Sequence, residues 1–434
     1  MFIIKEGVDV SFSYGIQDHN KDYAQWRGLI RIGKALQQPD YIHYALERID
    51  SFVKNNYLYD GFWKEVTLSY HRQVTSGLYN VLSLVTRYSD PEGYVYPGTG
   101  VRLENFRFLD YYPILRASNN LHNILSYPNG KFLPVQDTHA SQRATVGNDT
   151  YKDALMSASG IAKLTGNTNA LNQDQTHAYM MFTPKYGHNH NDALSLSMFS
   201  YNVELLPDIG YTHTRNRSWA TSTLGHNTVT VNQKNSQSKD GGNILRYVPS
   251  ENTVGVIRAY DQIAYNEIDV YDREVVYVPM NEKGPEGYLL DIFRVSGGKI
   301  HEYSLNMGAD YDYDLTSDIK WQYNSETMLP EGVKYVKPTV ESSAGNASGH
   351  YPAYMFVEDV QSAELKNQPY KISYVTTEGF YAGTGLNILG AADSGEIFIG
   401  KAPSMRATRA SMANDLNDQC DDYYLDKMIY RREG

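Results

Sequence analysis

The spacing of apolar residues changes once along this chain of 434 residues. Through the first third, apolar residues recur every three or four positions in segments 22–37 and 40–56, which predicts amphipathic helices. The same period returns at about 70–89, 103–118 and 150–165, with loops rich in Pro and Gly between these segments. This pattern is typical of antiparallel helical hairpins, the repeating unit of an α/α toroid.

From about residue 176 the period falls to two. Runs such as "ALSLSMFSYNVELL", "REVVYVPM" and "YLLDIFRVSGG" alternate apolar and polar residues between turn residues, which predicts an antiparallel β-sandwich. Helices first and strands afterwards indicate an α+β protein with two packed domains. We place the boundary in a polar stretch, which gives a helical domain at 1–172 and a sandwich domain at 173–434.

Composition narrows the classes of partner. The formal net charge of −11 argues against a general polyanion-binding surface, so no nucleic acid is expected, and an acidic substrate requires positive charge gathered in a cleft. The chain has 38 tyrosines, whose apolar body and polar tip suit surfaces that bind sugars. A lone cysteine, Cys420, excludes an intramolecular disulfide framework and a cysteine-rich zinc site.

Two further patterns bear on membranes and export. No apolar run approaches the roughly 18 residues that a membrane-spanning helix needs, so no span is expected. The N-terminal stretch "MFIIKEGVDVSF" has no basic region followed by a long apolar one, so no signal peptide is visible in this chain.

The stretch "GHNHNDALSLSMF" places His188, His190 and Asp192 at the entrance to a predicted strand. Three interpretations are open. The histidines form ordinary hydrogen bonds at a polar strand entry, or they belong to a binuclear hydrolase site, or they contribute to a single metal site. The second is weakened by Ala193, because the metallo-β-lactamase signature has another histidine there.

The metal interpretation draws on residues further along the chain. Asp208 follows the strand in "LLPDIGY", and His226 lies in "STLGHNTVTVNQ". Two histidines and a carboxylate are an ordinary ligand set for zinc, with water completing the shell. If a sheet forms here, His190, Asp208 and His226 converge while His188 faces a cleft.

Several motifs together resemble the heparinase II/III-like polysaccharide lyases. The central motif is H-x-H-x-D, a strand, D-x-G, and then H-N-T at the next strand, which the segment 187–231 reproduces. Upstream, "DGFWKEVTLSYHRQV" resembles the family's helix entry, and "YPNGKFLPVQDT" resembles its loop of Pro and Gly that ends in an aspartate. "YLLDIFRVSGGKIHEYSLN" resembles its sandwich strand pair.

The resemblance implies a site and a reaction. Tyr70 matches the catalytic tyrosine and His188 the catalytic histidine, while the family's neutraliser of the substrate carboxylate falls among Gln17, His19 and Asn20. The implied activity is β-elimination in an acidic polysaccharide that contains uronic acid, which leaves an unsaturated uronate end. His190, Asp208 and His226 match positions that hold a structural divalent metal in some members, with zinc expected and calcium as the alternative.

The same resemblance bears on architecture and location. Family members carry more helical hairpins upstream, so the fold class expected here is α+β, with an incomplete N-terminal α/α toroid followed by an antiparallel β-sandwich. The family implies a secreted or periplasmic protein. The glycan, the cutting mode and the oligomeric state stay open.

Three more residues are candidates for the substrate side of the site. Arg215 or Arg217, in "HTRNRSW", offers a bidentate clamp for an acid group. Glu65 either orients a catalytic group or starts the following helix as an acidic residue of the first turn. Two other classes stay open: a glycoside hydrolase, which needs two carboxylates such as Asp60 and Glu65 flanking the bond, and a glycan-binding protein without catalysis.

Overall fold

The computed structural model describes most of the chain, which folds into two compact units, Met1–His122 and Asn123–Gly434. The described residues are 2–13, 18–166, 172–183, 187–212, 216–237, 239–251, 253–281, 284–308, 312–333, 353–377, 382–404 and 424–434. No helix among them combines the length and apolar character needed to cross a membrane.

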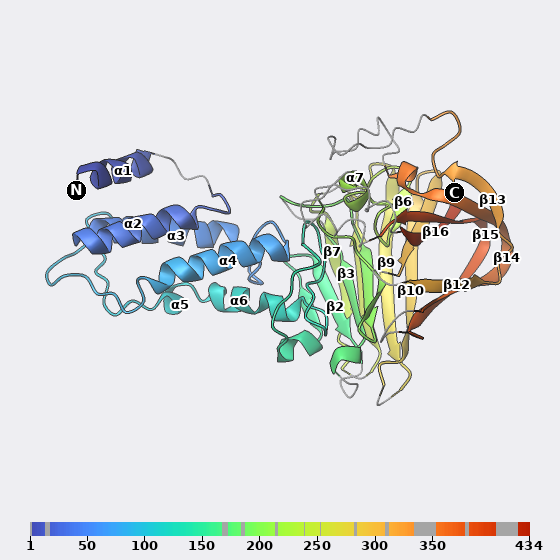
Figure 1. Ribbon diagram of the computed structural model, residues 1–434, viewed down its shortest axis with the longest axis horizontal. Helices are drawn as coiled ribbons and strands as arrows, with labels where there is room; N and C mark the ends of the chain where they lie inside the picture. The colour runs from blue at the N-terminus through green and yellow to red at the C-terminus, as the bar shows by residue number, and fades with distance from the viewer. Residues whose placement is uncertain are drawn as a thin grey trace. The chain divides into compact units, whose positions relative to one another are not determined.

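The first unit is helical (Figure 1). Its helices are α1 (Phe2–Ser13), α2 (Tyr23–Leu36), α3 (Pro39–Asn56), α4 (Leu68–Ser83), α5 (Phe108–Tyr111) and α6 (Ile114–Ile124), the last of which ends two residues into the second unit. The helix α2 packs against both α3 and α4. Gly77 allows one close approach, because a Cβ atom there would lie 2.5 Å from the ring of Tyr23.

The pattern of buried residues on α4 matters for the site. Leu68, His71, Val74, Leu78 and Val81 are buried at intervals of three and four residues, as an amphipathic helix requires. Thr67 caps the helix by accepting a hydrogen bond from the backbone N–H of Tyr70 at 3.2 Å. Tyr70 itself lies off the buried stripe and is half-buried.

The second unit is built from antiparallel sheets (Figure 1). The order β1-β2-β3-β4-β5 forms the first sheet and β10-β9-β8-β7 the second; the third is β12-β14-β15-β16-β11-β6, with β13 paired to β14. The strands are β1 (Ala154–Met156), β2 (Ile161–Thr165), β3 (His177–Met181), β4 (Ser195–Ser200), β5 (Val203–Leu206), β6 (Val229–Val231), β7 (Gly242–Val248), β8 (Gly255–Asp261), β9 (Ile268–Pro279), β10 (Gly287–Gly297), β11 (Ile300–Met307), β12 (Tyr313–Ser317), β13 (Gln322–Thr327), β14 (Glu358–Thr376), β15 (Gly385–Pro403) and β16 (Tyr424–Glu433).

Short helical turns connect some of these strands. They are the 3-10 turns η1 (Asn148–Tyr151), η2 (Asn172–Asp174) and η3 (Tyr354–Phe356) and the four-residue helix α7 (Arg217–Ala220). One large apolar core draws residues from all three sheets, including Met180 of β3, Leu196 of β4, Val275 of β9 and Ile397 of β15. Helices followed by antiparallel sheets confirm the predicted α+β class.

The helix predicted at 150–165 is wrong. Residues 154–156 and 161–165 form β1 and β2, and the five residues of β2 are buried on both faces. A short, fully buried run has no period that separates a strand from a helix, and this is why the sequence pattern misled there. The two units of the structure meet at 122/123, before these strands, whereas the boundary predicted from composition lies at 172/173.

Candidate functional site

The predicted ligand set is brought together in the second unit. The loop before β4 carries His190, the turn after β5 carries Asp208, and the segment before β6 carries His226. All three side chains are buried, and one ligand atom from each lies within 4.8 Å of the others. His190 Nδ1 lies 3.3 Å from His226 Nε2, and His226 Nε2 lies 3.7 Å from Asp208 Oδ2.

These spacings fit a divalent ion. Ligand atoms about 2.1 Å from a tetrahedral zinc lie roughly 3.4 Å from one another. The other hydrogen bonds of the two histidines fix which atoms face the ion. His226 Nδ1 lies 2.7 Å from the Ser222 carbonyl and so donates to it, while His190 Nε2 lies 2.9 Å from the carboxylate of Asp137 and donates there. Two lone pairs and a carboxylate therefore meet in a buried space, which favours a cation.

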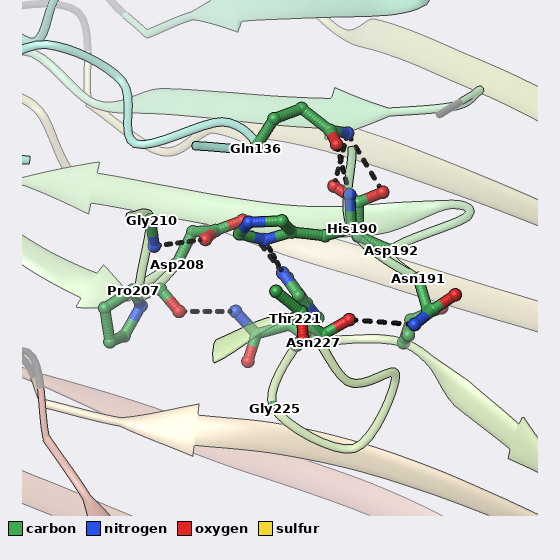
Figure 2. A network of polar contacts seen from close by, with 12 residues as sticks. Gln136, His190, Asn191, Asp192, Pro207, Asp208, Gly210, Thr221, Gly225 and Asn227 are labelled. Atoms are coloured by element: carbon green, nitrogen blue, oxygen red, sulfur yellow. Dashed lines mark hydrogen bonds and ion pairs between the residues drawn. The ribbon is translucent and has the colours of Figure 1, made fainter. Parts of the chain in front are cut away.

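Hydrogen bonds explain the other residues of the D-x-G and H-N-T motifs around these three side chains (Figure 2). Gly210 has a φ of +68°, and its N–H donates to Asp208 Oδ1 at 2.9 Å, which accounts for the D-x-G motif. In the H-N-T motif, Asn227 donates to the carbonyls of Leu196 and Pro207, and so ties the start of β6 to β4 and to the end of β5. The ligand set thus lies on tightly bonded backbone.

Burial changes the proton affinities of the set. It raises the pKa of Asp208 to about 6, against the opposing charge of His190. It also lowers the pKa of His226 to about 4. Both shifts follow from the cost of a charge in a dry site, and a bound cation would compensate that cost for the carboxylate.

Asp192, the aspartate of H-x-H-x-D, does not join the ligand set. Its two oxygens accept hydrogen bonds from Gln136 Nε2 at 3.1 and 2.8 Å, while Gln136 Oε1 accepts from the backbone N–H of His190 at 2.5 Å (Figure 2). Burial raises the pKa of Asp192. Gln136 therefore joins the backbone of the motif's second histidine to the side chain of its aspartate.

His188 has a different environment from His190. Its side chain is 32% exposed, and its Nδ1 lies 2.9 Å from Asp137 Oδ2. Asp137 is 1% exposed, and Arg217 of α7 donates to both of its oxygens. Burial alone would raise the pKa of Asp137, but hydrogen bonds from His188, His190 and Arg217 outweigh it and bring the pKa far below its ordinary value. The carboxylate is ionised.

Arg217, predicted as a substrate clamp, has both terminal nitrogens on Asp137, and its guanidinium lies 5.1 Å from the ring centre of Tyr211. Arg215 lies outside the described residues. Sequence reasoning assigned no role to Gln136 and Asp137. The signal was present, since both belong to the loop of Pro and Gly that carries part of the family resemblance.

The predicted residues of the first unit form a separate group. Tyr70 lies on α4, and Glu65, which is half-buried, lies two residues before the cap of that helix. Gln73, one turn after Tyr70, donates through Nε2 to the backbone carbonyl of Asn20 at 3.3 Å. The segment with His19 and Asn20 is therefore held beside α4, whereas Gln17 lies outside the described residues.

His71 is not part of this group. It is fully buried, its Nδ1 accepts from the backbone N–H of Trp63 at 3.0 Å, and its Nε2 donates to the Ser118 carbonyl at 2.8 Å. Burial is the main cause that lowers its pKa to about 3, with a smaller contribution from His122. His71 is a neutral core residue that fixes the turn before α4.

Comparison with known proteins agrees with this architecture. Residues 148–273 match the family model "Heparinase II/III-like, C-terminal". No curated protein matches the chain by sequence. Among solved structures, a heparinase III gene product aligns with 99% of this chain and 59% of its own length, at 13% identity and a TM-score of 0.63.

Two further solved structures are similar in fold. The heparan sulfate lyase HepC from Pedobacter heparinus aligns with 98% of this chain and 61% of its own, at 11% identity and a TM-score of 0.56. Another heparinase III aligns with 96% and 62%, at 14% identity and a TM-score of 0.54. The chain spans less than two thirds of the length of these proteins. Residues 148–273 thus match the C-terminal model of the heparinase II/III-like family that the motifs resemble, and the chain shares its fold with these solved structures.

Proposed function

We propose that this protein is a polysaccharide lyase that cleaves a glycan containing uronic acid by β-elimination. The base removes the proton on C5 of the uronate, the bond between C4 and the bridging oxygen breaks, and an acid protonates the leaving oxygen. The product is a sugar end with a double bond conjugated to the carboxyl group. The observation that carries the proposal is the arrangement of the H-x-H-x-D motif: one histidine is buried among metal ligands and the other is partly exposed on an ionised carboxylate.

The proposed acid is Tyr70. An ordinary tyrosine has a pKa of about 10, so at neutral pH it carries the proton that the leaving oxygen needs. The proposed base is His188, or Tyr70 itself, according to the epimer that is cut. His188 donates from Nδ1 to Asp137, so the lone pair of its ring lies on Nε2, the atom that would accept the C5 proton.

The substrate carboxylate must also be stabilised, because the C5 proton is barely acidic beside a full negative charge. Hydrogen bonds to that carboxylate lower the energy of the developing enolate, as an oxyanion hole does. We assign this task to the segment that carries Gln17, His19 and Asn20. The bond from Gln73 to the Asn20 carbonyl supports the assignment, because it fixes this segment one helical turn from Tyr70.

A divalent ion, zinc in our proposal and calcium as the alternative, would be held by His190, Asp208 and His226. When bound, the ion would supply positive charge between the loop before β4 and the segment before β6, and would so hold these two segments together. The residues themselves orient the loop that carries His188 and exclude water from the ligand set. A polymeric acidic substrate does not cross a membrane, so we place the reaction outside the cytoplasm.

A panel of uronate polysaccharides tests the proposal, with the ultraviolet absorbance of the unsaturated uronate as the readout. Alginate, glycosaminoglycans, ulvan and bacterial exopolysaccharides form the panel. Absorbance that grows with time on at least one of them supports the lyase. New reducing ends without absorbance would indicate a hydrolase, and binding without either product would indicate a glycan-binding protein; both results would contradict the proposal.

A further inference from the structure

Asp137 is the one carboxylate that contacts both histidines of the H-x-H-x-D motif among the described residues. Its Oδ2 lies 2.9 Å from His188 Nδ1, and its Oδ1 lies 2.9 Å from His190 Nε2. Its backbone N–H also donates to the His188 carbonyl at 3.2 Å. The aspartate thus holds His188 by side chain and by backbone, although 51 residues separate the two in sequence.

The chemistry of these contacts fixes the protonation of both rings. An ionised carboxylate only accepts hydrogen bonds, so His188 carries a proton on Nδ1 and His190 carries one on Nε2. The atoms left with lone pairs are then Nε2 of His188 and Nδ1 of His190. His190 Nδ1 is the atom that faces His226 and the ligand set, so one carboxylate fixes the tautomer of both histidines.

Arg217 completes the arrangement. A lone buried carboxylate is costly, and the two nitrogens of the guanidinium that donate to Asp137 offset that cost. A third contact, from Nη1 to the Thr212 carbonyl at 3.4 Å, and the ring of Tyr211 hold the guanidinium in place. Both terminal nitrogens of Arg217 are therefore directed at Asp137.

We propose that Asp137 is the positioning residue of the site and that it orients the catalytic histidine and the metal-binding histidine together, with Arg217 as its clamp. The inference rests on the lyase function proposed above. The role proposed for Asp137 requires two acceptor atoms in fixed positions. An amide at residue 137 has a single acceptor atom, its oxygen, beside an NH2 group that only donates, so it can hold only one of the two histidines in the tautomer that the carboxylate fixes.

The tautomer of His188 is the direct test and needs no substrate. Nitrogen NMR of the protein labelled with ¹⁵N-histidine distinguishes protonation on Nδ1 from protonation on Nε2, and His188→Gln identifies the signal. We expect Nδ1–H in the wild type. In Asp137→Ala we expect a shift toward Nε2–H, the tautomer that free neutral histidine prefers. An unchanged tautomer in folded Asp137→Ala would overturn the proposal.

Catalysis provides the second readout, with Asp137→Asn as the variant that best preserves the fold. We expect kcat to fall about 10- to 100-fold with KM little changed, or the bound metal to be lost, because one histidine loses its acceptor. Asp90→Asn is the matched control: Asp90 is buried in the helical unit and accepts from His43 Nε2 at 2.9 Å, so its loss tests stability alone. Asp137→Asn with the kcat and metal content of the wild type would overturn the proposal.

Variants of Arg217 separate the clamp from direct contact with substrate. Arg217→Met should lower kcat, and Arg217→Lys should restore part of the loss, because an ammonium group can still donate to Asp137. A rise in KM with kcat unchanged would instead mean that Arg217 binds the substrate, and would overturn its role as clamp. If the wild type cleaves no polysaccharide, the proposed function fails, while the tautomer measurement still decides the role of Asp137.

Discussion

In both units a buried histidine lies close in sequence to a partly exposed candidate for catalysis, but the two arrangements arise differently. On α4, His71 is buried and its neighbour Tyr70 is half-buried. Successive residues of a helix point roughly 100° apart, so the backbone alone separates them. Before β4, His190 is buried and His188 is 32% exposed, although residues two apart would share a face in a regular strand.

In the loop before β4, the different exposure of His188 and His190 therefore depends on side-chain contacts. On α4, the helical period alone separates Tyr70 from His71. Asp137 holds both histidines and Gln136 holds the backbone of His190. Since both come from a loop about 50 residues earlier, the site of the second unit exists only after two distant segments pack together. The helical group is expected to tolerate local change, whereas the β4 group is expected to fail when a distant partner is removed.

The largest effect is expected at Tyr70. Tyr70→Phe removes only the hydroxyl, so the helix remains while turnover falls by a factor of about a hundred or more. The formation of unsaturated uronate on a substrate that the wild type cleaves is the measurement. Full activity in Tyr70→Phe would contradict the assignment.

Tyr79→Phe is a matched control on the same helix. The Tyr79 hydroxyl donates to the Leu115 carbonyl at 2.9 Å and has no part in the proposed chemistry. Its loss should cost about 1 kcal/mol of stability and leave turnover unchanged.

Removal of the metal should affect stability more modestly. An ion that binds only the folded state stabilises it by about 4 kcal/mol when it is present at a thousandfold excess over its dissociation constant. A chelator should then lower the Tm by roughly 5 to 10 °C. Calorimetry with and without chelator measures the shift, and an equal Tm in both would count against a bound ion.

The smallest expected effect is on the pH dependence of the free energy of unfolding, and it concerns the helical unit. Burial lowers the pKa of His71 from its ordinary value of about 6.5 to about 3. Between these values the unfolded chain binds a proton that the native state does not, so the free energy of unfolding falls as the pH falls below about 6.5. In His71→Gln the fall between neutral pH and about pH 4 should be smaller than in the wild type, by denaturant titration.

His301→Gln is the control for this pH dependence of the free energy of unfolding, because His301 is a half-buried histidine on β11. An equal fall in the free energy of unfolding with pH in His71→Gln and in the wild type would contradict the neutral, buried state of His71.

Sequence predicted the periodic parts of the molecule best. The segments expected to be helical at 22–37 and 40–56 are α2 (23–36) and α3 (39–56), because amphipathic periods of this length are distinctive. The predicted convergence of His190, Asp208 and His226 is also confirmed, since one ligand atom from each lies within 4.8 Å of the others. The fully buried strand β2 was missed, because burial on both faces removes its period.

The role of Asp137 could not be predicted, for a different reason. Its loop carries a recognisable pattern, but which histidine its carboxylate meets depends on how that loop packs beside β4. The same holds for Arg217, which the sequence suggested as a clamp for an acid group of the substrate and whose guanidinium donates to the carboxylate of Asp137. Interactions between segments far apart in sequence decide both.

The metal content of two variants tests the central claim most directly, namely that His188 and His190 have different tasks. Elemental analysis of protein prepared without chelator should find about one divalent ion per chain in the wild type and in His188→Ala, and none in His190→Ala. His188→Ala should nevertheless lose turnover. Equal metal content in the two variants, whether both keep the ion or both lose it, would contradict the account.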